Sequence, residues 1–280
     1  MPLICFSSPK GGVGKTSLTA NIAHALSRAG RRVALLDLDP QNALRLHFGV
    51  PIGDSAGFMT RLAGPGDPLA MLRQTAAGPA LLPHGAVDMH QALALGAMLG
   101  TNPGLLMDPV QRLLADPELL LIADTPPGAS QAMAAILSAA ALVVVILLAD
   151  AASTALLPQV ESGAFLGQGT LGSLFASRAR FVVNQVDPAS RLSVSSAESV
   201  AGHLGQRLLG AVLRDPAVGE ALAYQRLLLD HAPEATATRD IRAIAHTIAA
   251  SIARPPATFA QPAPAPQMPA LLDPANWSRP

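Results

Sequence analysis

Short apolar runs alternate with helix-like segments along most of the chain. The runs are uniformly apolar and do not alternate with polar residues, which is typical of strands buried on both faces of a parallel sheet. This order predicts an α/β protein with a mostly parallel central sheet covered by helices on both faces. The predicted strands are 3–7, 33–37, 119–124, 142–148, 181–184 and, more weakly, 208–213; the predicted helices are 16–29, 107–115, 130–139, 195–204 and 240–253.

The longest apolar stretch, 132–149, has 18 residues with Ser138 as its one polar interruption, and this is long enough for a membrane span. Its first half is rich in alanine, its second half is β-branched, and Asp150 follows closely. That change of character favours a helix followed by a buried strand over a spanning helix.

Two other regions have no clear period. The segment 53–104 is rich in glycine and proline and predicts short helices and loops laid over the sheet. After Arg254, prolines recur at short intervals, so neither a helix nor a central strand can continue. We therefore expect one domain over 1–253 and a flexible Pro/Ala-rich tail over 254–280. The tail segment 271–277 holds the one tryptophan and is either inert or a docking motif for a partner.

Composition narrows the possible functions. Hydrophobic residues make up 50% of the 280 residues and charged ones 14%, which excludes a wholly disordered chain. Lys+Arg and Asp+Glu both number 19, and zero net charge argues against holding DNA by bulk charge. The single cysteine, Cys5, excludes an internal disulfide and a cysteine-built zinc site. No secretory signal is predicted at the N-terminus, so a cytoplasmic location is expected.

The strongest motif is a glycine-rich loop, Ser8-Pro9-Lys10-Gly11-Gly12-Val13-Gly14-Lys15-Thr16, between a predicted strand and a predicted helix. Its glycines allow several backbone N–H groups to point into one concavity, and the helix adds its positive N-terminal dipole. Lys15 is placed to reach the β- and γ-phosphates of a nucleotide, and the Thr16 hydroxyl to bind Mg²⁺. Pro9 stands where the usual pattern has glycine, and a second lysine, Lys10, stands at the entrance of the loop.

The run Lys10-Gly11-Gly12-Val13-Gly14-Lys15-Thr16 resembles the deviant Walker A motif of the ParA/MinD superfamily of dimerising ATPases. The resemblance covers about residues 1–253 and implies a three-layer P-loop NTPase fold, ATP and Mg²⁺ as ligands, and a homodimer in the ATP state. It implies that Lys10 crosses the interface to the partner's nucleotide and acts there in catalysis with Lys15. The implied ATP-binding residues are Gly11, Gly12, Val13, Gly14, Lys15, Thr16 and Ser17.

Three aspartates at strand ends complete the expected site. Asp37 and Asp39 alternate at the end of the second predicted strand and so share a face at the carboxyl edge of the sheet. The resemblance assigns Asp39 to orienting the attacking water and Asp37 to a metal-linked role, although a strand-end cap also explains the pair. Asp124 ends a run that resembles a Walker B strand and would bind Mg²⁺ with Thr16, and Thr125-Pro126-Pro127 resembles the switch-II loop.

The base of the nucleotide is expected farther along the chain. The resemblance implies that Asn184 binds adenine and that Arg214 and Pro216 belong to a later base-binding loop. Asp187 stands where related GTPases place a guanine-reading aspartate, so guanine stays open. Asp150 receives no role from the resemblance.

The run Asn42-Ala43-Leu44-Arg45-Leu46-His47-Phe48-Gly49 resembles the BcsQ branch, ATPases encoded with bacterial cellulose synthase. That resemblance implies a slow, switch-like ATPase that regulates assembly or placement of the cellulose synthase secretion complex, with cytoplasmic components of the complex as partners. The rivals are a ParA-type partition ATPase that coats DNA and a MinD-like membrane switch. The second needs a basic amphipathic C-terminal helix, which the proline-rich tail does not supply. Recruitment to the inner membrane would then run through partners.

Overall fold

The computed structural model describes residues 2–62, 64–167 and 169–253. The expected tail, including the docking segment 271–277, lies outside these residues. The described strands form one sheet in the order β3-β4-β2-β5-β1-β6-β7-β8, and only β3 runs antiparallel to its neighbour. Their bounds are β1 Leu3–Ser7, β2 Arg32–Asp37, β3 Arg73–Gln74, β4 Ala80–Leu82, β5 Leu119–Asp124, β6 Ala140–Leu148, β7 Ala179–Val186 and β8 Leu208–Leu213.

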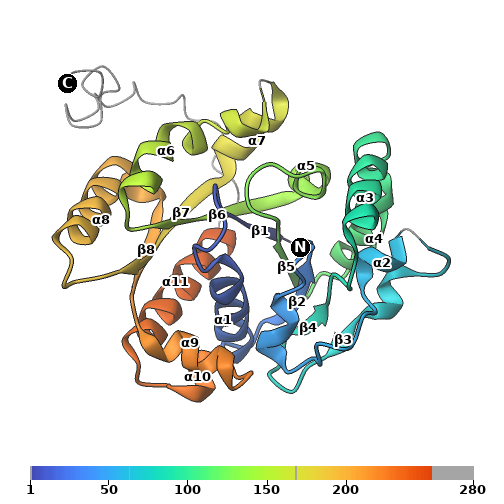
Figure 1. Ribbon diagram of the computed structural model, residues 1–280, viewed down its shortest axis with the longest axis horizontal. Helices are drawn as coiled ribbons and strands as arrows, with labels where there is room; N and C mark the ends of the chain where they lie inside the picture. The colour runs from blue at the N-terminus through green and yellow to red at the C-terminus, as the bar shows by residue number, and fades with distance from the viewer. Residues whose placement is uncertain (1, 63, 168, 254–280) are drawn as a thin grey trace.

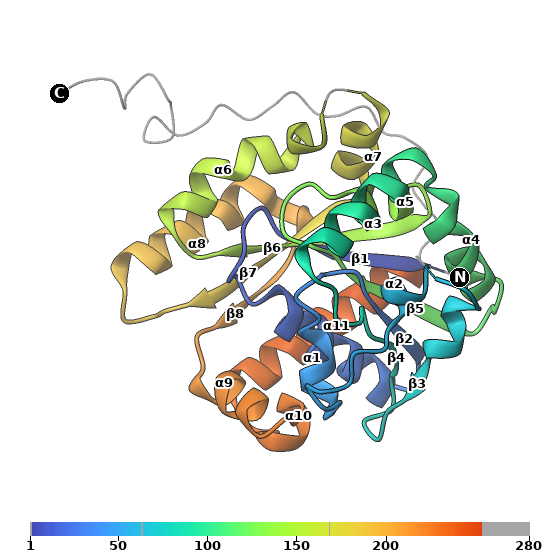
Figure 2. The ribbon, with the colours of Figure 1, turned by 45° about the vertical axis from the view of Figure 1, so that its right-hand side comes forward.

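Helices cover both faces of this sheet, as Figures 1 and 2 show. Side chains of β1 alternate between two separate hydrophobic cores: Leu3 and Cys5 enter one, and Ile4 and Phe6 enter the other. The helices α2 to α8 contribute to the first core, and α1, α9, α10 and α11 to the second. The expected three-layer α/β architecture is thereby confirmed. The helices are α1 Lys15–Arg28, α2 Phe58–Leu62, α3 Met89–Thr101, α4 Gly104–Leu114, α5 Gln131–Leu137, α6 Ala151–Glu161, α7 Thr170–Arg178, α8 Arg191–Leu204, α9 Pro216–Ala223, α10 Leu228–His231 and α11 Thr236–Ala253.

The long apolar stretch divides as expected. Ser130 caps α5 by accepting a hydrogen bond from the Met133 N–H, and α5 ends at Leu137 before β6 begins at Ala140. Strand β6 lies between β1 and β7 with most of its side chains buried. No helix in the described ranges is long and apolar enough to cross a membrane.

The expectation for 53–104 was wrong in part, because this region adds two strands and a regular helix. Strand β4 pairs with β2 in parallel, but its three residues are too few to show a period. Helix α3 has 13 residues without an Asp, Glu, Lys or Arg, and it leaves Met89 and Leu93 exposed. Its sequence therefore lacks the polar face by which an amphipathic helix is recognised.

Candidate nucleotide-binding site

Strand β1 leads through the glycine-rich loop directly into α1. Gly12 and Gly14 have φ angles of 77° and 81°, in the left-handed region that favours glycine. Gly14 is the N-cap of α1, and the first turn of this helix carries no acidic side chain that would repel an anion. The loop therefore has the strand-to-helix setting that the motif predicted.

Gly14 is held between this loop and β7. A Cβ there would lie 2.5 Å from Asn184 Nδ2, whereas a Cβ at Gly11 would meet nothing within 4 Å. We expect Gly14→Ala to lower the free energy of unfolding by about 1–3 kcal/mol, because left-handed strain adds to the displacement of Asn184. Urea denaturation without nucleotide measures this, with Gly11→Ala as the matched control. Equal destabilisation by the two substitutions would contradict the account.

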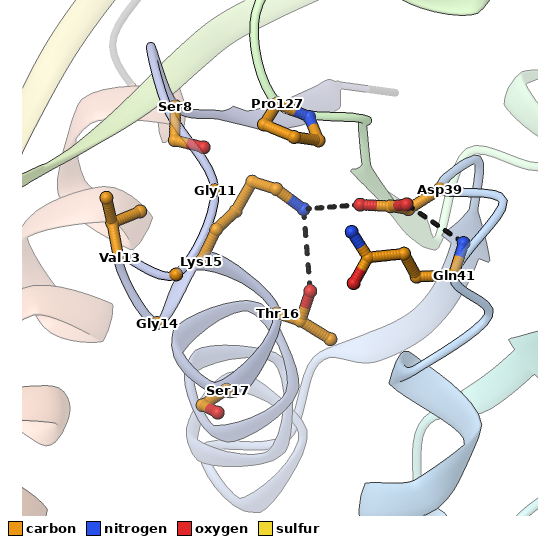
Figure 3. A pocket seen from close by; sticks show the side chains of 11 residues that line it. Ser8, Gly11, Val13, Gly14, Lys15, Thr16, Ser17, Asp39, Gln41 and Pro127 are labelled. Carbon is orange, nitrogen blue, oxygen red and sulfur yellow. Dashed lines mark hydrogen bonds and ion pairs between the residues drawn. The ribbon is translucent and has the colours of Figure 1, made fainter.

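A buried cluster of charged and hydroxyl side chains surrounds the Lys15 ammonium, which Figure 3 shows beside Asp39 and Thr16. The Nζ atom lies 2.5 Å from Asp124 Oδ1 and 3.7 Å from Asp39 Oδ2. Thr16 donates a hydrogen bond to Asp124 Oδ2 at 2.7 Å, and Thr19 donates to Asp124 Oδ1 at 3.2 Å. Because β1 and β5 are adjacent parallel strands, their carboxyl ends bring the lysine and this aspartate together.

Burial opposes the ionisation of Asp124, which has no exposed surface. This burial raises the pKa of its carboxyl, although the charge and hydrogen bond of Lys15 act in the opposite direction. The Lys15 side chain is itself only 6% exposed. Each charge in this pair thus depends on the other for compensation.

Asp37 shapes the loop that follows β2. Its Oδ1 accepts a hydrogen bond from the Asp39 N–H at 3.0 Å, and its Oδ2 accepts one from the Leu44 N–H at 3.3 Å. Burial, reinforced by the charge of Asp124, raises the pKa of Asp37 well above its usual value. Both oxygens have backbone partners, and Asp37 does not line the pocket. The metal-linked role expected for it stays a prediction.

The raised pKa of Asp37 has a measurable consequence for stability. When folding raises the pKa of an aspartate, its stabilising contribution is complete below the pKa of the unfolded chain, about 3.9. That contribution is lost as pH rises through the pKa of the folded state. Asp37→Asn removes that titration, so the stability difference between wild type and variant should shrink as pH rises from about 4 to 8. Urea denaturation across this range measures it. A difference that grows with pH would show that the folded state favours the carboxylate.

Asp39 lines the pocket together with a residue of the loop after β5. Asp39 Oδ1 accepts a hydrogen bond from the Gln41 N–H at 3.0 Å. Pro127 lines the same pocket, and the following Gly128 donates its N–H to the Ser8 carbonyl at 2.7 Å. The loop of Asp39, which is expected to orient the attacking water, and the loop that resembles switch II therefore both reach the pocket at the glycine-rich loop, as Figure 3 shows.

The donors of the loop fit a polyphosphate. Among the described residues, the N–H groups of Gly11, Gly12 and Gly14 donate to no protein oxygen, and the first-turn amides of α1 have no intrahelical acceptors. Such convergent amides with a lysine form an anion site. Mg²⁺ beside a phosphate keeps few protein ligands, and Thr16 Oγ1 and the Asp124 carboxylate are the oxygens placed to hold it. Val13 and Ser17 also line the pocket, and their contact with a nucleotide stays a prediction.

The residues expected to bind the base lie outside this pocket. Asn184 is buried, and its Nδ2 donates to the Val13 carbonyl at 2.8 Å, which ties β7 to the glycine-rich loop. The exposed Arg214 guanidinium lies 3.8 Å from Asp187, and Pro216 begins α9. The adjacent strands β7 and β8 bring these residues to one edge of the sheet. Their role in binding the base stays a prediction.

Lys10 also lies outside the pocket. Its ammonium forms an ion pair with Asp150 at 2.7 Å, although 140 positions separate the two residues. Asp150 lies two residues beyond the end of β6, and β6 is the neighbour of β1. The sequence contained no signal for this contact, because only the strand order places the two residues together.

Comparison with known proteins settles the family. The family model described as cellulose biosynthesis protein BcsQ matches residues 1–248. The chain belongs to the BcsQ family. The chromosome-partitioning ATPase Soj of Thermus thermophilus is 28% identical to this BcsQ-family chain over 260 residues, covering 89% of the chain and 96% of Soj. Segments of 48 to 62 residues match other curated relatives at 39% to 53% identity, and these matches span only 15% to 25% of each relative's length.

Two solved structures share the BcsQ-family fold described here. The cell division ATPase MinD of Pyrococcus furiosus is 26% identical with a TM-score of 0.68, covering 89% of this chain and 98% of MinD. Cobyrinic acid a,c-diamide synthase of Mycobacterium smegmatis, solved with an ATP analogue and magnesium, is 26% identical with a TM-score of 0.62, covering 80% and 91%. The predicted relation to ParA/MinD-type ATPases is confirmed.

Proposed function

We propose that this BcsQ-family protein is an ATPase that dimerises with ATP and acts as a slow switch in assembling or placing the cellulose synthase secretion complex. One observation carries the enzymatic part: Lys15, Thr16 and Asp39 line one pocket, the buried Asp124 contacts both Lys15 and Thr16, and Lys10 stands outside the pocket. Membership of the BcsQ family supports a role in cellulose synthesis. The full-length relationship to Soj supports the reaction, ATP and water giving ADP and phosphate.

Each residue has a chemical task in this proposal. The loop amides and Lys15 bind the β- and γ-phosphates, and Asp39 orients the water that attacks the γ-phosphate. Mg²⁺, when bound by Thr16 and Asp124, offsets phosphate charge. Lys10, 29% exposed, lies at the rim and supplies a positive charge to the nucleotide of a second subunit. In the dimer the two pockets thus face each other, and each receives Lys10 from the opposite subunit.

ATP-dependent dimerisation is the first test. In light scattering coupled to gel filtration, the wild type should double its mass with Mg²⁺ and a non-hydrolysable ATP analogue and stay monomeric with ADP. Lys15→Ala is the control that should stay monomeric with both. A wild-type protein that remains monomeric with the analogue contradicts the proposal.

The role in cellulose synthesis is tested separately, by capture of cytoplasmic cellulose synthase components with the analogue but not with ADP.

Similarity to Soj makes DNA binding the principal rival. The zero net charge argues against it, and we expect no ATP-dependent retention of DNA on a filter even at about 50 mM salt, where phosphate contacts are strong. The protein is expected to attach to the membrane only through partners.

The isolated protein should therefore not sediment with anionic liposomes in the presence of ATP. DNA retention would favour a partition function, and sedimentation would favour a MinD-like switch.

A further inference from the structure

Lys10 is held inside its own subunit by an aspartate with two tasks. Asp150 Oδ2 accepts the hydrogen bond of the Lys10 ammonium at 2.7 Å. Asp150 Oδ1 accepts the Ser153 N–H at 2.7 Å and so caps α6. The cap fixes the carboxylate, and the fixed carboxylate then holds the lysine.

The backbone of the same segment is also anchored. Ser8 Oγ donates to the Lys10 carbonyl at 2.9 Å, and the Gly128 N–H donates to the Ser8 carbonyl at 2.7 Å. The Lys10 segment therefore joins the glycine-rich loop, the loop after β5 and the start of α6. Partial burial raises the pKa of Asp150, but the hydrogen bonds from Lys10 and Ser153 outweigh it and leave the pKa below its usual value. Asp150 is therefore charged at neutral pH.

We infer that Asp150 is a positioning residue that retains Lys10 in the single subunit and competes with the partner's nucleotide for its ammonium group. This inference rests on the proposed function. In this inference the ammonium that lies 2.7 Å from Asp150 leaves the aspartate to reach the second subunit. Dimerisation must therefore break this pair once in each subunit.

The size of the effect follows from the exposure of the pair. Lys10 and Asp150 are 29% and 38% exposed, so solvent screens their attraction. Pairs of this kind change an equilibrium constant by about 1.4- to 5-fold. Because both subunits must release a lysine, loss of both pairs should tighten the dimer by about 2- to 25-fold.

Asp150→Asn is the test, because the amide oxygen still caps α6 while the charge is gone. Sedimentation velocity with Mg²⁺ and the ATP analogue should give a dimer dissociation constant lower by that factor. Asp116→Asn is the matched control, since it removes one charge from an exposed pair with Arg32, remote from the loop, and should leave the constant unchanged. An Asp150→Asn dimer that is equally tight or weaker overturns the inference.

A second readout follows the lysine itself in the nucleotide-free monomer. Lys10 and Lys15 are the two lysines of the chain, and the Lys15 side chain is only 6% exposed. Brief acetylation followed by mass spectrometry therefore reports on Lys10. Asp150→Asn should speed its labelling, and an unchanged rate overturns the inference. If the wild type never dimerises while labelling still speeds up, the proposed function fails and the contact between Asp150 and Lys10 stands.

Discussion

Replacing Lys15 with alanine should abolish Mg-ATP binding, with a loss of affinity of about 100-fold or more. A charged hydrogen bond contributes about 1.5–3 kcal/mol, and Lys15 is placed to make such bonds to two phosphates. The substitution also leaves the fully buried Asp124 carboxyl without the cation that compensates its charge. Isothermal titration calorimetry with the ATP analogue measures the affinity.

Two further variants separate charge from folding. Lys15→Gln keeps a hydrogen-bond donor for Asp124, and the same loss of affinity is expected from it because the positive charge is missing. Lys10→Ala should bind the analogue nearly as the wild type does, since Lys10 lies outside its own pocket. Thermal unfolding checks that each variant is folded. An affinity within about threefold of wild type for Lys15→Ala would remove the basis for this site.

Asp39→Ala should lower ATP turnover by about 10²- to 10⁴-fold while leaving ATP binding and dimerisation in place. The carboxylate lines the pocket, and the proposed function assigns it to orienting the attacking water. Its Oδ2 lies 3.7 Å from the Lys15 ammonium, so removing it takes away a negative charge that competes with phosphate. The variant should therefore collect in the ATP-bound dimer.

Phosphate release and gel filtration test this in one sample. We expect almost no release together with a persistent dimer when hydrolysable ATP is added. Asp116 forms an exposed ion pair with Arg32, so the control variant Asp116→Ala should hydrolyse ATP at the wild-type rate. Turnover at the wild-type rate by Asp39→Ala would show that another group orients the water.

The sequence predicted the layers of this fold because its central strands are short, apolar and separated by helices. The bounds of β1, β5 and β8 match the prediction residue for residue. Strand β4 was missed because its three residues carry no recognisable pattern. It is a strand because it pairs with β2. Helix α3 was missed because its exposed face is apolar. Tertiary context overrides local pattern at both places.

The glycine-rich loop could be predicted because its chemistry lies in consecutive residues. Contacts between residues of different strands and loops could not be predicted in this way. Asp150 reaches Lys10, and Asn184 reaches Val13, only because β6 and β7 follow β1 in the strand order. Asp37 and Asp39 show the same limit: alternation predicted a shared face for them, but β2 ends at Asp37, and the backbone of the following loop takes both oxygens of Asp37.

A mixture of two inactive variants shows whether Lys10 acts on the nucleotide of a second subunit. Lys10→Ala and Asp39→Ala are combined before ATP is added, and the burst of phosphate is measured. In a mixed dimer, one site keeps its own Asp39 and receives Lys10 from the partner. Random pairing should then restore hydrolysis at up to about one site in four. If Lys10 serves its own subunit, no site regains both groups, and a mixture no more active than either variant alone would contradict the account.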